Sequence, residues 1–103
     1  MTEYHKLVRD KIPELIRYQG QTPCYRVLAD GEYTRCLKDK LSEEVAEFLR
    51  DQTSEELADI LEVVYALGED LGYSPAELEK IRREKAEKRG AFREKIFLIG
   101  KEG

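Results

Sequence analysis

EYTRCLKDKLSEEVAEFLRDQTSEELADILEVVYALGEDL, residues 32–71, is the stretch of this sequence that decides its fold. Two helical patterns lie in it, from Glu32 to about Asp51 and from Glu55 to about Leu71. The apolar positions of the first are Leu37, Leu41, Val45, Phe48 and Leu49; those of the second are Leu57, Ile60, Leu61, Val63, Val64, Leu67 and Leu71. Only a short polar connection separates the two patterns, which predicts two antiparallel neighbouring helices.

Four acidic residues are prominent in these two patterns. Glu44 and Glu47 lie on the first helix, and Glu56 and Asp59 lie on the second, each pair at i, i+3 and therefore on one side of its helix. At 100° per residue, Glu44 points within about 20° of Leu37, and Glu56 also falls within the apolar arc. Carboxylates on a buried face are costly unless a positive charge meets them.

The antiparallel arrangement places the four acids at similar heights on facing helices, because both pairs lie near the connection. The usual positive partner for converging carboxylates is a hard divalent cation, Mg²⁺ or Mn²⁺. Cations held in this way polarise a phosphoanhydride and lower the pKa of an attacking water, and a carboxylate can take the proton of that water.

Two plainer explanations compete with a metal site. Glu43, Glu44 and Glu47 are also typical of a solvated helix face, with basic neighbours to pair with. Glu56 is also the third residue of a capping box if Thr53 is the N-cap. The joint pattern of level i, i+3 acids on consecutive helices, two of them at apolar positions, favours the metal site.

The remainder of the chain predicts shorter elements. Asp10 is expected to cap a short helix from about Lys11 to Tyr18, and residues 24–28, CYRVL, suggest a small β segment. A capping box at Ser74 predicts a further helix to about Arg89. The apolar residues of the segment 92–99 are expected to pack back on the body or on a second subunit.

Composition limits the possible classes of protein. The 103 residues predict one domain, residues 1–103, and the chain is 39% charged with a net charge of −4. A pI of about 5.1 argues against binding of a nucleic-acid polymer. The sequence shows no transmembrane run and no signal-peptide pattern, and its two cysteines and single histidine make zinc unlikely. We expect a cytoplasmic protein with free thiols and no membrane contact.

Basic residues gather at the two ends of the chain, around Lys6–Lys11 and along the helix that ends near Arg89. Such runs are usually solvated faces, but next to a metal site they also suit a polyphosphate. The candidates for contact with phosphate are Arg9, Lys11, Lys85 and Arg89.

The acidic pattern resembles the metal motif of the MazG-like, all-α nucleoside triphosphate pyrophosphohydrolase superfamily. KLVRDKIPELI at 6–16, EELADILEVVYAL at 55–67 and EKRGAFREKIFL at 87–98 resemble its small single-domain branch. The interval between Glu47 and Glu56 is shorter than in many full-length MazG proteins, which implies trimmed helices and a more open pocket.

The resemblance implies an all-α fold, an antiparallel helical bundle completed by oligomerisation to a homodimer or homotetramer. It implies Mg²⁺-dependent cleavage of a nucleoside triphosphate to the monophosphate and pyrophosphate. Glu44, Glu47, Glu56 and Asp59 would be the metal ligands and Glu43 an accessory ligand, and Glu44 would also be the catalytic base. Two rival readings are the related phosphoribosyl-ATP pyrophosphohydrolase of histidine biosynthesis and a catalytically silent helical interaction module.

Overall fold

The computed structural model describes residues 2–103, and in that range the chain forms four α-helices and no strand. The helices are α1 (Ile12–Tyr18), α2 (Asp30–Asp51), α3 (Ser54–Asp70) and α4 (Pro75–Arg89). The expectation of an all-helical protein is confirmed. The β segment predicted at residues 24–28 is wrong, because a short extended segment needs a partner strand and this one has none among the described residues.

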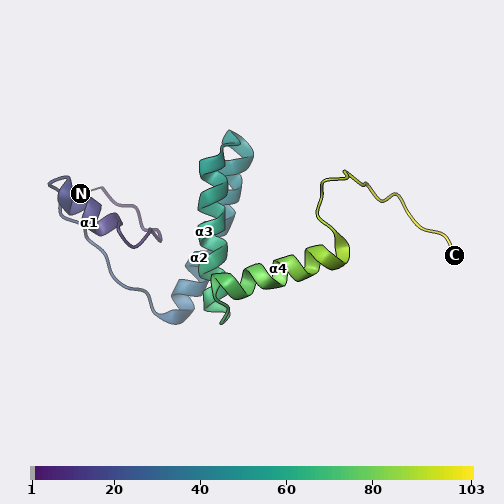
Figure 1. Cartoon of the computed structure of the whole chain (residues 1–103). Coiled ribbons are helices and arrows are strands. Elements are labelled where there is room, and N and C mark those ends of the chain that lie inside the picture. Colours follow the sequence, from purple (N-terminus) through teal and green to yellow (C-terminus); the bar gives the residue numbers. More distant parts are fainter. Residues whose placement is uncertain (1) are drawn as a thin grey trace.

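Helices α2 and α3 form the antiparallel hairpin that the sequence predicts, and they stand side by side at the centre of Figure 1. The chain turns at Gln52, whose φ of 55° is left-handed, and at Thr53, whose hydroxyl accepts the backbone N–H of Glu56 at 3.4 Å. At the opposite end of the hairpin, the Thr34 hydroxyl donates to the Asp70 carboxylate at 2.7 Å. The Thr34–Asp70 contact joins α2 to α3 at this end, and the Thr53 cap begins α3 directly after the turn.

The core of the hairpin is small. Within residues 2–103, Leu37 and Val63 are the only large apolar side chains that are buried, with 3% and 7% of their surfaces exposed. Figure 1 shows why: α1 lies to one side of the hairpin, and α4 extends away on the other, so that the molecule measures 65 × 31 × 22 Å. Most apolar surface of this chain therefore faces solvent.

A fixed elbow joins α3 to α4. The Tyr73 N–H donates to the Gly68 carbonyl at 2.8 Å, and Leu78 packs so closely against Gly68 that an added methyl group would lie 3.3 Å from its Cδ2. The Ser74 hydroxyl accepts the Glu77 N–H at 3.1 Å, and the Glu77 carboxylate accepts the Ser74 N–H at 3.0 Å, which confirms the predicted capping box. These contacts direct α4 away from the hairpin.

Two expectations for the chain ends are wrong in part. Lys11, not Asp10, is the N-cap of α1, and it makes no side-chain cap hydrogen bond, since an ammonium group has no acceptor for a backbone N–H. The apolar tail, residues 92–99, does not pack back on its own body: each of its five large apolar side chains is at least 77% exposed. The elbow explains this, because α4 leads the tail away from the hairpin.

None of the helices in residues 2–103 combines the length and apolar character that a bilayer-crossing helix needs.

Candidate functional site

Glu44 is the most unusual side chain of the hairpin. It lies on the inner side of α2 with 6% of its surface exposed. Lys40 Nζ lies 3.3 Å from Glu44 Oε1 and 3.7 Å from Glu43. The second oxygen, Oε2, is buried and has no hydrogen-bond partner from residues 2–103. A carboxylate in this setting retains an unmet requirement for a positive group or a donor.

Glu47 lies one turn further along α2, within reach of the negative charge of Glu44. The neighbouring Glu44 carboxylate is the largest cause of the raised pKa of Glu47, followed by desolvation. Glu43 raises this pKa further, and only Arg50 opposes the rise. Negative charge is therefore crowded on this part of α2 beyond what the nearby basic residues neutralise.

Glu56 brings a third carboxylate to this region from α3. Its Oε2 atom is also buried with no hydrogen-bond partner in the described part of the chain. Desolvation is the main cause of its raised pKa, and the neighbouring Asp51 side chain and the charge of Glu47 add to the rise. The charge of Glu47 therefore acts on Glu56 across the hairpin, as the charge of Glu44 acts on Glu47 along α2.

Asp51, at the end of α2, is a participant that the sequence analysis missed. Its pKa is lowered, chiefly by a hydrogen bond from Arg50 and then by the neighbouring Glu56 side chain. The Arg50 Nε–Asp51 Oδ1 distance is 3.1 Å. Its place three residues before the N-terminus of α3 is a signal that could have found it, since a hairpin turn returns the chain to the same height.

Asp59 has a different partner. Arg9, from the segment before α1, places its Nη2 2.6 Å from Asp59 Oδ1 and its Nη1 3.8 Å from Glu62. Among residues 2–103, no three acidic, histidine or cysteine side chains are grouped closely enough to surround a cation. In this arrangement, the acidic residues meet Lys40, Arg50 and Arg9 as counterions.

The other basic candidates lie further from the acids. Lys11 is exposed at the start of α1, and Lys85 and Arg89 are exposed in the second half of α4. Because α4 runs away from the hairpin in Figure 1, the structure brings Arg9 alone of the four candidates to the acidic side chains.

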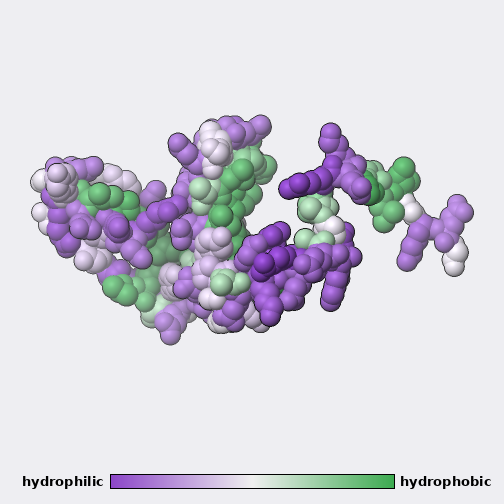
Figure 2. Space-filling view, in the orientation of Figure 1, coloured by the Kyte–Doolittle hydropathy of each residue, from purple (hydrophilic) through white to green (hydrophobic). Residues whose placement is uncertain are grey.

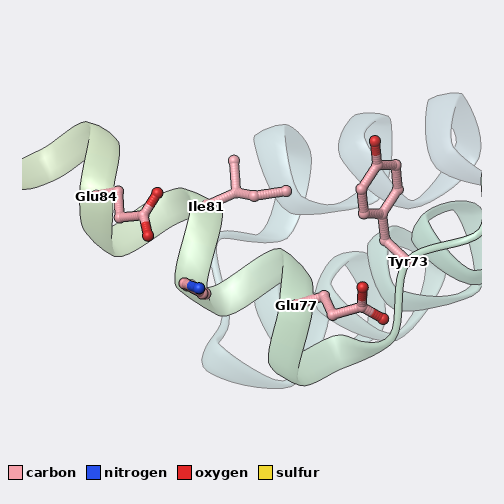
Figure 3. Close-up of a pocket in the computed structure, with 5 residues that line it drawn as sticks. Tyr73, Glu77, Ile81 and Glu84 are labelled. Carbon is pink, nitrogen blue, oxygen red and sulfur yellow. The ribbon is translucent and has the colours of Figure 1, made fainter.

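A shallow hollow at the elbow is separate from these acids. It is lined by Tyr73, Glu77, Lys80, Ile81 and Glu84. In Figure 3, Tyr73 and Ile81 project to the same side of α4, while the Glu77 carboxylate turns back toward the start of the helix, where it accepts the Ser74 N–H. Glu77 serves the cap, and the hollow offers no convergent set of polar groups.

Comparison with known proteins adds one relative. No family model matches the chain, and no solved structure matches it. A protein of Mycolicibacterium smegmatis (strain ATCC 700084 / mc(2)155), described as an uncharacterized protein, is 62% identical over 42 residues. The match covers 41% of this chain and 43% of that relative, so less than half of either protein is compared. The likeness carries no information about activity.

Proposed function

We propose that this chain is a Mg²⁺-dependent nucleotide pyrophosphohydrolase that cleaves a nucleoside triphosphate to the monophosphate and pyrophosphate. One observation carries the proposal: Glu44 Oε2 and Glu56 Oε2, on facing helices, are both buried without a hydrogen-bond partner from residues 2–103. Unmet carboxylate oxygens are costly in a small core, which makes a ligand the simplest reason for keeping them.

The donor atoms are of the kind that a hard cation prefers, and a bound ion would draw together side chains that are not grouped around a common centre in the metal-free chain. All the available donors are carboxylate oxygens, which Mg²⁺ and Mn²⁺ prefer, and the raised pKa values of Glu47 and Glu56 reflect uncompensated negative charge. Glu44, Glu47, Glu56 and Asp59 would hold the ion, with Glu43 as an accessory ligand. When bound, such an ion polarises the phosphoanhydride and acidifies the attacking water.

The protein's own residues would divide the remaining work. The Glu44 carboxylate takes the proton of the water whose oxygen attacks phosphorus, while the bond to the pyrophosphate leaving group breaks. With an ion bound, Asp59 would leave Arg9, whose guanidinium would then be free to contact phosphate oxygens. Lys11, two residues further along the chain, would approach phosphate only if the segment before α1 shifted with Arg9. Lys85 and Arg89, on the projecting α4, would serve substrate in a homodimer or homotetramer in which α4 lies against another copy.

A pyrophosphate-release screen over nucleoside triphosphates, with and without Mg²⁺, tests the proposal. The screen should include phosphoribosyl-ATP, because preferential release from that compound would favour the histidine-biosynthesis reading. We expect Mg²⁺-dependent release that falls at least 100-fold in Glu44→Gln and Asp59→Asn, since each loses a ligand.

Glu69→Gln is the matched control, because Glu69 is an exposed acid of α3 at the far end of the hairpin. Its turnover should equal that of the unaltered chain. Normal turnover in both Glu44→Gln and Asp59→Asn would refute the site assignment. Absence of release from every nucleotide, together with no Mg²⁺-dependent rise in melting temperature, would refute the enzyme and favour an interaction module.

A further inference from the structure

The surface of this chain is too large for a stable monomer of its size. The accessible surface is 9613 Å², whereas a compact monomer of 12.0 kDa exposes about 6,000 Å². The excess is larger than the 1,000–2,500 Å² or so that each chain of an obligate homodimer buries. Another chain could therefore cover this surface at the scale of a permanent interface.

The exposed apolar surface of the hairpin lies on one face. Measured from the buried Leu37 at 100° per residue, Val45 and Leu49 lie about 80° and 120° to one side, and Glu47 lies about 80° to the other. On α3, Leu57 and Leu61 fall on the side opposite Asp59 and Glu62 by the same measure. Because the helices are antiparallel, the two apolar sides share a face, here called the apolar face (Val45, Leu49, Leu57 and Leu61).

The acids and Arg9 lie on the reverse side of the hairpin from this apolar face. Arg9 bridges Asp59 and Glu62 there, so the N-terminal segment occupies the acidic side and leaves the apolar face open. Figure 2 shows apolar residues gathered along the hairpin on the side turned away from α1, and a separate apolar group at the tail. All four side chains of the apolar face are at least 37% exposed.

The tail matches this face in its apolar chemistry. Its five large apolar residues are Phe92, Ile96, Phe97, Leu98 and Ile99. Residues 92–95 form a turn, in which the Lys95 N–H donates to the Phe92 carbonyl at 3.4 Å, and residues 96–99 follow it as a continuous apolar run. The elbow contacts at Gly68 and Ser74 hold α4 away from its own hairpin, so the tail is presented to a neighbour.

We propose that a second copy of this chain covers the apolar face with its tail, residues 92–99, in a reciprocal exchange between two protomers. In the dimer, the apolar face and the tail of each copy, which are both exposed in the single chain, are buried. The two-fold symmetry uses both tails and both apolar faces, so no further copy can add in the same way. The proposed enzyme also calls on an assembly of copies for Lys85 and Arg89, but neither the tail nor the apolar face contains a proposed metal ligand, so the assembly can be tested by its mass without an activity measurement.

Light scattering coupled to size exclusion tests the assembly. We expect twice the 12.0 kDa chain mass for the unaltered protein, and a twofold fall to the single-chain mass for Phe97→Asp and for Leu49→Asp. Both positions are exposed in the single chain, so helix content by circular dichroism should stay unchanged. Phe97→Leu is the matched control and should keep the doubled mass, as should the proposed inactive variant Glu44→Gln.

A single-chain mass for the unaltered protein would overturn the proposal, as would a doubled mass in both Asp variants.

Cross-linking then distinguishes exchange of tails between two chains from packing of the tail on its own chain. In a background of Cys24→Ser and Cys36→Ala, one tagged chain carries Leu49→Cys and a differently tagged chain carries Phe97→Cys. After a short bis-maleimide is added, we expect a product with both tags. Cross-linking only within one chain that carries both cysteines would exclude exchange.

Discussion

The two halves of the α2–α3 hairpin differ in the side chains that they place between the helices: apolar in the half near α4, acidic in the half near the loop. At the elbow half, Leu37 and Val63 are buried between the helices, and the Thr34–Asp70 hydrogen bond closes the end. At the loop half, Glu44 and Glu56 occupy inward positions where apolar side chains would stabilise the contact. One half provides stability, and the other gives up stability for a set of carboxylates, which is the pattern expected of a functional site.

The largest effect should come from breaking the elbow half. Leu37→Ala removes the most buried apolar side chain, and we expect a loss of about 2–3 kcal/mol in the free energy of unfolding. Urea denaturation followed by circular dichroism measures this loss. Leu71→Ala is a control of equal chemistry at an exposed position just after α3 and outside the apolar face, and it should cost clearly less. Equal losses would show that Leu37 is not the centre of the core.

In the loop half, a substitution that introduces an apolar side chain should increase the free energy of unfolding. Glu44→Leu places an apolar side chain at an apolar position, and Glu43, 3.7 Å from Lys40, remains as the partner of that lysine. We therefore expect the metal-free variant to be more stable by about 1 kcal/mol, while pyrophosphate release is lost. The same urea titration without Mg²⁺ measures this change. A destabilised variant would show that Glu44 supports the fold.

A smaller effect should appear in the pH dependence of stability without metal. The pKa values of Glu47 and Glu56 are raised in the folded chain above the usual 4.5. The folded state therefore binds more protons, so these two groups lower the stability as the pH rises from about 4.5 through their folded values. Melting temperatures from pH 7 down to pH 5 should rise, and less so in Glu47→Gln. A slope identical in that variant would contradict the assignment.

The sequence was most informative where local patterns act alone. The limits of α2, α3 and α4 follow from periodicity, the Thr53 cap and the Ser74 capping box, and each of these was predictable within a residue or two. The prediction of a β segment at residues 24–28 was wrong because strand-forming side chains make a strand only beside a second strand. The position of the tail could not be predicted because it depends on the angle between α3 and α4, which the Gly68–Leu78 contact sets.

The candidate site divides in the same way. The sequence by itself determined that Glu44 and Glu56 interrupt apolar stripes and that a short connection brings the four acids to similar heights, because helical period and chain direction are local properties. Only the tertiary structure decided that Arg9 meets Asp59 and that two oxygens remain unpartnered within residues 2–103. These outcomes depend on side chains distant in sequence meeting in space, and periodicity carries no record of such meetings.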